Sequence, residues 1–240
     1  MLNRLCADYY HGKIKDNIII NFIKSIPAGE SLLDVGAGEM PYKIFCNHIN
    51  YTSQDFCKYD GKGDNKGIQT RTFNTENIDI VSDISMIPVD DNSYDKVICT
   101  EVLEHVINPN DAIGEMFRIL KPGGKLLIGV PGTSLLHFSP YHYYTGFKLN
   151  YFIKLFAENE FQIDRIVRVG SIYSVIALYI WFIIQKISNV VFPVNPPLLF
   201  KMVIIFMTPI IFILMLLDKI KILDPETLEA GILVIGTKQL

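Results

Sequence analysis

Glycines and acidic residues follow several short apolar runs of this chain, and these residues could bind a ligand. Gly36 and Gly38 come directly after the first run, and neither carries a Cβ that would keep the backbone away from a bound molecule. Asp55, Asp83 and Glu101 follow three later runs. Because an ionised carboxylate accepts several hydrogen bonds, Asp55 could bind both hydroxyls of a ribose. Asp83 could likewise accept from the exocyclic amine of a purine.

Apolar runs and amphipathic stretches alternate along the chain, which predicts an α/β fold. Strands are expected at 32–35, 51–54, 78–81, 94–100 and 125–130, and helices at 17–26, 42–48 and 111–120. Strands separated by helices imply right-handed crossovers and a largely parallel sheet. Ligands of such sheets bind beyond the carboxyl ends of the strands, where the strand order reverses. The glycines and acids all fall at those ends, so we expect them to meet in one site.

Composition excludes some classes of protein. The net charge of -3 and the absence of a long Lys/Arg run give no electrostatic basis for binding nucleic acid. The four cysteines, Cys6, Cys46, Cys57 and Cys99, lack metal-site spacing, which favours free thiols in a reducing compartment. The first residues contain no apolar signal core, so the catalytic part is expected in the cytoplasm.

Five motifs occur in order between Leu32 and Arg165: LLDVGAGEMPY, YTSQDF, IVSDISMIPVDDNSYDKVICTEVLEHV, FRILKPGGKLLIGVPG and HFSPYHYYTGF. Together they resemble the class I S-adenosylmethionine (SAM) dependent methyltransferases of the type 11 branch. The resemblance implies a Rossmann-like seven-stranded, mostly parallel sheet with helices on both faces. It adds a sixth strand at 161–169 and an antiparallel seventh at 231–237. A nicotinamide dehydrogenase is disfavoured, because Pro41 stands where its fingerprint requires a third glycine.

The resemblance also implies the cofactor, SAM, and its product S-adenosylhomocysteine. In this family the loop carrying Gly36 and Gly38 binds the methionine end of SAM. The acid matching Asp55 binds the ribose, and the acid matching Asp83 faces the adenine. The full set of expected cofactor-binding residues is Asp34, Gly36, Ala37, Gly38, Asp55, Phe56, Asp83, Ile84, Thr100 and Glu101.

Histidines supply the candidates for proton transfer. A hydroxyl acceptor must lose its proton, and we expect His142, in the presumed lid PYHYY, to remove it, with His105 as a second candidate. Glu101, Glu104 and His105 also form an E-x-x-E-H arrangement that resembles the metal motif of some SAM-dependent O-methyltransferases. Helical spacing would put these three on one face, and His137 or His142 could complete the set. Many relatives carry EHV without a known metal, so we expect no metal.

An apolar insertion separates the sixth and seventh strands. It comprises residues 172–184 and 202–217, joined by a turn at Asn195-Pro196-Pro197. The expected organisation is a methyltransferase domain at 1–170, a helical hairpin that contacts membrane at 171–223, and a returning strand at 224–240. A soluble pair of core helices is the alternative, but a domain of this size has little core left to cover two stretches that are apolar on all sides.

Both ends of the insertion must lie on one side of a membrane, because strands six and seven pair in one sheet. Each run is shorter than a straight span unless Lys186 or Lys201 is drawn in, which favours a hairpin in one leaflet over a two-pass span. Flanking basic residues would meet anionic headgroups at the cytoplasmic face: Arg165, Arg168, Lys219 and Lys221.

The expected function is therefore methyl transfer from SAM to a hydroxyl of a small or lipid-linked acceptor, such as a lipid-linked saccharide, a glycan precursor or an isoprenoid ring. A catalytically silent SAM-binding subunit that recruits a membrane partner is one alternative. An RNA methyltransferase is another, although the chain lacks a basic face. Oligomer formation through the hairpin stays open.

Overall fold

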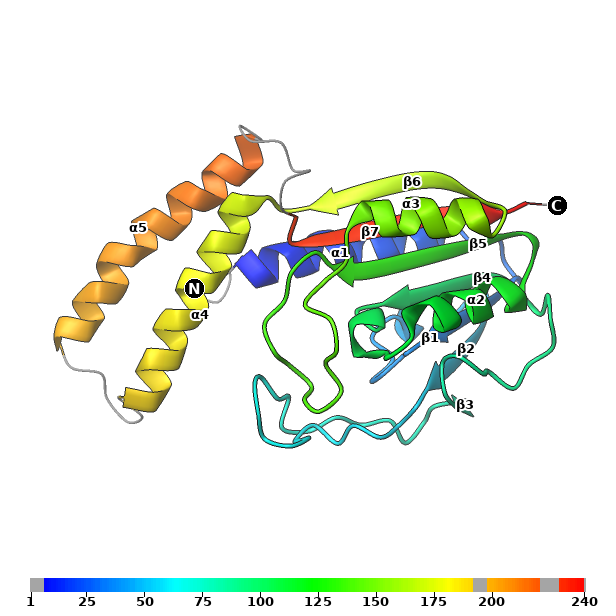
Figure 1. The fold of residues 1–240 in the computed structure, drawn as a ribbon, viewed down its shortest axis with the longest axis horizontal. Coiled ribbons are helices and arrows are strands. Elements are labelled where there is room, and N and C mark those ends of the chain that lie inside the picture. The colour runs from blue at the N-terminus through cyan, green and yellow to red at the C-terminus, as the bar shows by residue number, and fades with distance from the viewer. Residues whose placement is uncertain (1–6, 192–197, 221–228, 240) are drawn as a thin grey trace. The chain divides into compact units, whose positions relative to one another are not determined.

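Figure 1 shows the computed structural model, which describes residues 7–191, 198–220 and 229–239. The chain divides into two compact units. One comprises Asn17–Val167 and Ile232–Leu240, and the other comprises Met1–Asp16 and Arg168–Gly231. The sequence had assigned residues 1–170 to a single domain. The compact units group the start of the first helix with the insertion, and the expected domain boundaries stay a prediction.

Within the described residues, seven strands form one sheet. They are β1 (Ser31–Val35), β2 (Asn50–Asp55), β3 (Ile80–Val81), β4 (Tyr94–Thr100), β5 (Leu120–Pro131), β6 (Phe161–Val169) and β7 (Gly231–Lys238). The strand order is β3-β2-β1-β4-β5-β7-β6. The pairs β1/β2, β1/β4, β2/β3 and β4/β5 are parallel, and β7 runs opposite to its neighbours (Figure 1). This confirms the expected Rossmann-like sheet, whose order reverses between β1 and β4.

Helices cover both faces of the sheet (Figure 1). α2 (Pro109–Ile119) and α3 (Leu149–Glu158) pack on one face, and the 17–24 part of α1 (Ala7–Lys24) packs on the other. α2 and α3 bury one apolar stripe each, with Ile113 and Met116 on α2 and Phe152 and Phe156 on α3. These side chains and the inward residues of the central strands form the main core, which holds the strand ends in place.

Two expected elements differ from the structure, and one helix was not expected. The helix expected at 42–48 is a single 3-10 turn, η2 (Lys43–Phe45), because the chain between β1 and β2 is short and the glycine turn uses its first part. The strand expected at 78–81 is reduced to Ile80–Val81 at the sheet edge. α3 was not predicted, although Leu149, Phe152 and Phe156 have helical spacing.

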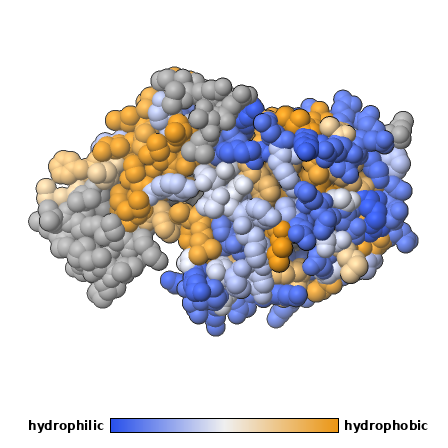
Figure 2. Space-filling model, in the orientation of Figure 1, coloured by the Kyte–Doolittle hydropathy of each residue, from blue (hydrophilic) through white to orange (hydrophobic). Residues whose placement is uncertain are grey.

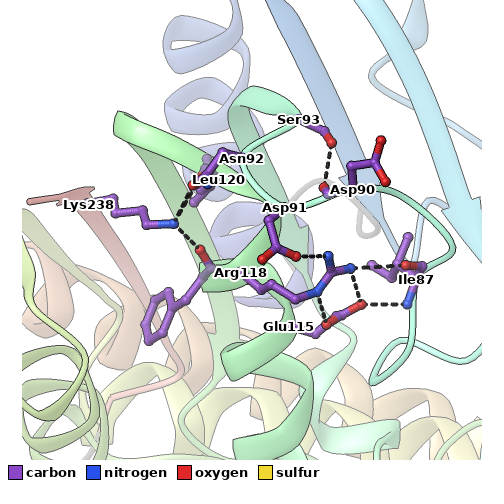
Figure 3. Close-up of polar contacts among 10 residues, drawn as sticks. Ile87, Asp90, Asp91, Asn92, Ser93, Glu115, Arg118, Leu120 and Lys238 are labelled. Carbon is purple, nitrogen blue, oxygen red and sulfur yellow. Dashed lines mark hydrogen bonds and ion pairs between the residues drawn. The ribbon is translucent and has the colours of Figure 1, made fainter. Parts of the chain in front are cut away.

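Two cations fix the end of α2. Lys238, near the end of β7, donates to Asn92 Oδ1 at 2.9 Å and to the carbonyl oxygens of Phe117 and Leu120 at 2.9 and 2.7 Å (Figure 3). Positive charge at a helix C-terminus is favourable, because the last carbonyls have no partner within the helix. The ammonium of Lys238 therefore joins the last strand to the end of α2.

Arg118, on the last turn of α2, is the second cation at the C-terminal end of this helix (Figure 3). Its guanidinium donates to the carboxylates of Glu115 and Asp91 and to the carbonyl of Ile87. Glu115 in turn accepts from the N–H of Ile87 at 2.7 Å. These bonds hold the loop before β4 against α2.

The second unit contains the insertion as two helices, α4 (Ile172–Val191) and α5 (Leu198–Ile220), which contact each other. Ala177, Ile184 and Ile211 are buried between them. At the base of the pair, Ser171 N and Oγ both donate to Asp218 Oδ1 at 2.6 Å. The turn expected at 195–197 lies outside the described residues. Neither α4 nor α5 meets the combined length and hydropathy of a membrane span in the part of the chain that is described, and the same is true of every other helix there.

Candidate functional site

The strand ends surround a cavity of about 420 Å³ within the unit built on residues 17–167. Gly36 follows β1, Asp55 ends β2, Asp83 follows β3 and Glu101 follows β4, and all four line this cavity. The volume lies in the range of small-molecule sites. The structure thus brings together the four positions that sequence reasoning had placed at the strand ends.

The glycine turn after β1 has no room for side chains. Gly36 has φ +68° and Gly38 has φ +53°, a region that residues with a Cβ rarely adopt. A Cβ on Gly36 would lie 2.4 Å from Val102 Cγ2, and one on Gly38 would lie 2.8 Å from Phe73 Cζ. The turn therefore packs closely between two side chains and presents its backbone to the cavity.

Asp55 is fixed by the glycine turn and by its own loop. Its Oδ2 accepts from Gly38 N at 3.0 Å, and its Oδ1 accepts from Cys57 N at 2.8 Å. The side chain is 5% exposed, yet each oxygen retains capacity for a further hydrogen bond. This leaves a carboxylate that is held rigidly and can still accept from two hydroxyl groups in the cavity.

Gln54, which sequence reasoning missed, also lines the cavity. Its Oε1 accepts from Gly36 N at 3.3 Å, and its Nε2 donates to Ser82 O at 2.8 Å. Gln54 therefore links the glycine turn of β1 to the segment after β3. No motif identifies it, because it is simply the residue before Asp55 on a buried strand.

Asp83 follows β3 and lines the cavity, and its side chain is held by a local turn. Its Oδ1 accepts from Ser85 N at 2.9 Å and from Ser85 Oγ at 2.7 Å. These bonds from Ser85 hold the pKa of Asp83 below its usual value, so the carboxylate is ionised. Ile84 beside it is buried and contributes an apolar surface to the same cavity.

Aromatic side chains form the rest of the wall. Tyr59 stacks on Phe138 with ring centroids 4.3 Å apart, and Phe56 meets Tyr141 edge to face at 5.1 Å. Residues 58–76 form a largely polar stretch between the second and third strands. The structure shows that this loop contributes the following lining residues: Lys58, Tyr59 and Phe73. The signal was present as aromatic residues within an otherwise polar stretch.

Three histidines cluster next to this wall. His105 lines the cavity, and its ring centroid lies 4.7 Å from that of His137 and 5.7 Å from that of His142. Burial, together with the neighbouring His137, lowers the pKa of His105 to about 3. Burial also lowers the pKa of His142, whose Nε2 lies 3.1 Å from Ser134 Oγ. The three rings are therefore grouped, with His105 nearest the cavity.

The E-x-x-E-H segment is not an α-helix. Glu101 has φ +56°, and only Leu103–His105 form a 3-10 turn, η3. The expectation that Glu101, Glu104 and His105 share a helical face is wrong, because the backbone after β4 turns before any helix begins. The structure instead gathers ligand atoms of Glu104, His105 and His137 within 4.8 Å of one another. Glu101 faces the cavity separately.

The described cysteines are free thiols. Cys46 and Cys99 are buried, and Cys57 is partly buried. Burial raises the pKa of Cys46 to about 11 and that of Cys99 well above its usual value, so neither supplies a thiolate nucleophile. Cys6 lies outside the described residues.

Comparison with known proteins identifies the domain that carries this cavity. Residues 33–128 match the family model described as "Methyltransferase domain". These residues form a methyltransferase domain.

Curated relatives are similar to parts of this chain. An uncharacterized protein of Methanocaldococcus jannaschii is 30% identical over 142 residues, which cover 58% of this chain and 55% of the relative. Demethylmenaquinone methyltransferase of Clavibacter sepedonicus is 29% identical over 104 residues, covering 42% of this chain and 41% of the relative. The chain thus spans about half of the length of these curated relatives.

The phosphoethanolamine N-methyltransferase 2 of Haemonchus contortus, solved in complex with S-adenosyl-L-methionine, has a similar fold. The TM-score is 0.53 at 16% identity, over 94% of this chain and 53% of that one. The likeness confirms the fold that the motifs predicted for the methyltransferase domain.

The expected cofactor residues of the methyltransferase domain fall into two groups. Those that line the cavity are Gly36, Asp55, Phe56, Asp83, Ile84 and Glu101. The others, Asp34, Ala37, Gly38 and Thr100, are not among the lining residues. Asp34 is 3% exposed, and its Oδ2 accepts from Tyr51 Oη at 2.8 Å. Burial raises the pKa of Asp34 to about 7. Its position supports the glycine turn rather than the cavity surface.

Proposed function

We propose that the methyltransferase domain transfers the methyl group of SAM to a hydroxyl group of a small-molecule acceptor. The carrying observation is the cavity in which the ends of β1, β2, β3 and β4 meet beside a group of histidines. The glycine turn supplies a backbone surface for the methionine end of SAM. Asp55 accepts from the ribose hydroxyls, and Asp83 with Ile84 contacts the adenine. The carboxylates of Asp55 and Asp83 offer the acceptors that these roles need, and Ile84 offers apolar surface.

The reaction needs little covalent help from the protein. The acceptor oxygen attacks the methyl carbon, the C–S bond breaks as the C–O bond forms, and the sulfonium becomes the neutral thioether of S-adenosylhomocysteine. The hydroxyl proton passes to a base or to water. Holding the oxygen in line with the C–S bond supplies most of the rate, because orientation removes an entropic cost. His105 at the cavity wall and His142 beside it are the candidate bases.

Methyl transfer from labelled SAM into a total lipid extract tests this function. We expect incorporation by the full chain and its loss in Asp55→Ala. Lys154→Gln is the control, because Lys154 is exposed on α3, away from the cavity. SAM binding without transfer to any extract would favour the catalytically silent subunit. Transfer into RNA alone would favour the RNA methyltransferase.

We also propose that the second unit attaches the protein to the cytoplasmic surface of a membrane. α5 is apolar on two sides. Ile211 contacts α4, whereas the opposite side exposes the following residues: Ile205, Phe206, Phe212, Ile213, Leu216 and Ile220. Their spacing places them on one face of the helix. Figure 2 shows apolar surface gathered over α4 and α5. An exposed stripe of this kind favours insertion of one helix face into a leaflet.

Attachment would bring the site close to lipid-borne acceptors, such as an isoprenoid quinone or a lipid-linked saccharide. Flotation with vesicles containing phosphatidylglycerol tests it. We expect the full chain to float, and Phe206→Lys with Ile213→Lys to abolish flotation. Ile44→Lys is the matched control, because Ile44 is an exposed isoleucine, 71% accessible, in the other unit. Flotation of the double variant would contradict attachment through α5.

A further inference from the structure

Three side chains from two segments meet beside the cavity of the methyltransferase domain. Glu104 and His105 belong to η3, and His137 belongs to the segment between β5 and α3. The carboxylate of Glu104 is 0% exposed. Its Oε1 lies 3.7 Å from His105 Nε2 and 3.9 Å from His137 Nε2. These three ligand atoms lie within 4.8 Å of one another, which is a spacing that one ion can bridge.

Hydrogen bonds determine which ring nitrogens face Glu104. His105 Nδ1 lies 2.9 Å from the carbonyl oxygen of Tyr141, and His137 Nδ1 lies 2.8 Å from that of Leu135. A carbonyl oxygen only accepts, so both Nδ1 atoms carry a proton. In a neutral ring the Nε2 atom is then unprotonated. Two nitrogen lone pairs and one carboxylate oxygen therefore converge, a group of acceptors that suits a cation.

This outer shell is typical of metal-binding histidines. Such residues usually donate their second ring N–H to a backbone carbonyl or a carboxylate, which fixes both the tautomer and the ring orientation. Both histidines here do so. The backbone is also held: Tyr143 N and Tyr144 N donate to Glu104 O at 2.9 and 3.2 Å. Residue 68 pairs with His137 in an isolated β-bridge, which fixes the other segment.

We propose that Glu104, His105 and His137 bind a divalent transition-metal ion of the Zn²⁺ type. Imidazole nitrogen suits zinc and its neighbours, whereas Mg²⁺ and Ca²⁺ prefer oxygen ligands. Two histidines and one glutamate form a known catalytic zinc set that leaves a coordination position open. A single carboxylate also leaves a net positive charge on the occupied site, which favours an anionic oxygen in the open position.

His142 places a third imidazole ring next to the three ligands. Its ring centroid lies 4.5 Å from that of His137. Ser134 Oγ donates to Thr145 O at 2.9 Å, so it accepts from His142 Nε2. The lone pair of a neutral His142 is then on Nδ1. The sequence alone favoured no metal, because many relatives carry EHV without a known metal, although His137 or His142 could complete the set.

The role of the ion rests on the proposed function. His105 lines the cavity, so an ion on its Nε2 would lie at the cavity wall. There it would coordinate the acceptor oxygen and lower the pKa of its hydroxyl group. The deprotonated oxygen is the better nucleophile toward the methyl carbon of SAM. The ion would thus activate the acceptor oxygen without a histidine acting as the base.

Metal binding is tested on the full chain after dialysis against a chelator. Titration with Co²⁺, followed by its visible absorption, and calorimetry with Zn²⁺ should each show one ion per chain. Glu104→Gln and His137→Gln should lose this binding and should keep SAM binding. His48→Gln is the control, because His48 Nε2 lies 3.1 Å from the carbonyl oxygen of Ile26 and His48 lies outside the cluster.

Three outcomes would overturn the proposed metal site. One is SAM binding without stoichiometric binding of either metal, which would leave the proposed function intact. Another is wild-type metal affinity in both variants. If the variants do not fold, X-ray absorption of the Co²⁺-loaded wild-type chain decides, and a spectrum without imidazole scattering would overturn the site. Absence of SAM binding in the wild type would instead count against the proposed function.

Discussion

The carboxylate of Asp55 accepts a hydrogen bond from the backbone N–H of Gly38 at 3.0 Å, which joins the end of β2 to the turn after β1. The bond holds the negative charge of Asp55 next to the backbone of Gly38, which has no side chain. Asp55 therefore shapes the glycine turn and also faces the cavity. Its replacement should affect both functions.

Asp55→Asn should weaken SAM binding by roughly 10–100-fold. The asparagine has one acceptor oxygen, so either Gly38 N or Cys57 N loses its partner, and a hydrogen bond to a charged group contributes about 1.5–3 kcal/mol. Calorimetry with SAM measures the effect. Asp83→Asn is the comparison, and it should bind more weakly without disturbing the turn. An unchanged affinity in Asp55→Asn would contradict its assignment to the ribose.

Gly36→Ala should lower both stability and SAM affinity. The left-handed backbone at φ +68° costs a residue with a Cβ roughly 1–2 kcal/mol, and the added carbon would lie 2.4 Å from Val102 Cγ2. Denaturant unfolding and SAM titration measure the two effects. Adding Val102→Ala should recover the part that is due to the close contact. If the double variant is no more stable than Gly36→Ala, the contact is not the cause.

Asp34 should make the apo protein less stable as the pH rises from about 4 to about 7. Burial raises the pKa of Asp34 to about 7, while in the unfolded chain it is near 3.8. The folded state therefore binds the proton more tightly, and its stabilising contribution, complete below about pH 4, is lost as the pH rises toward 7. Asp34→Asn should remove this decline, as measured by urea unfolding at several pH values.

Asp95 should change the stability with pH in the opposite direction to Asp34. Although burial opposes it, hydrogen bonds from Lys121 and Ser31 lower the pKa of Asp95 to about 2. Its contribution is present above about pH 4 and is lost as the pH falls toward 2. Asp95→Asn should therefore lower stability equally at pH 4 and pH 7. A pH-dependent difference in that window would contradict the assignment of the decline to Asp34.

Lys238→Met should destabilise the fold by about 1.5–3 kcal/mol. The ammonium donates to Asn92 Oδ1 and to two carbonyl oxygens at the end of α2, and these acceptors lose a charged donor. Urea unfolding measures the loss. Lys154→Met, at an exposed position of α3, should stay within about 0.5 kcal/mol of the wild type. Equal effects of both variants would show that the three bonds contribute little.

The sequence predicted those parts of the fold whose signal is local. β4 occupies Tyr94–Thr100 as expected, and α2 has the expected amphipathic spacing. The strand-end acids were placed correctly because parallel strands bring their carboxyl ends to one edge. η2 was predicted too long because helix length there is set by the distance between β1 and β2, which periodicity does not report.

The cavity wall could be predicted only in part. Asp55 and Asp83 follow strands, whereas Phe73 and His137 reach the site through long segments fixed by tertiary contacts. Glu104 and His105 were noticed together with Glu101, and His137 and His142 were both left open as completing ligands. The position of His137 depends on its bridge to residue 68. Contacts between loops distant in sequence leave no periodic pattern, so the histidine cluster required the structure.

Ser171, just before α4, donates two hydrogen bonds to the carboxylate of Asp218, near the end of α5. These bonds hold the start of α4 beside the end of α5. Helical turns could therefore be added to or removed from the opposite end of the pair without moving these two ends. Insertions or deletions in α4 and α5 should therefore be tolerated without a change in the cavity.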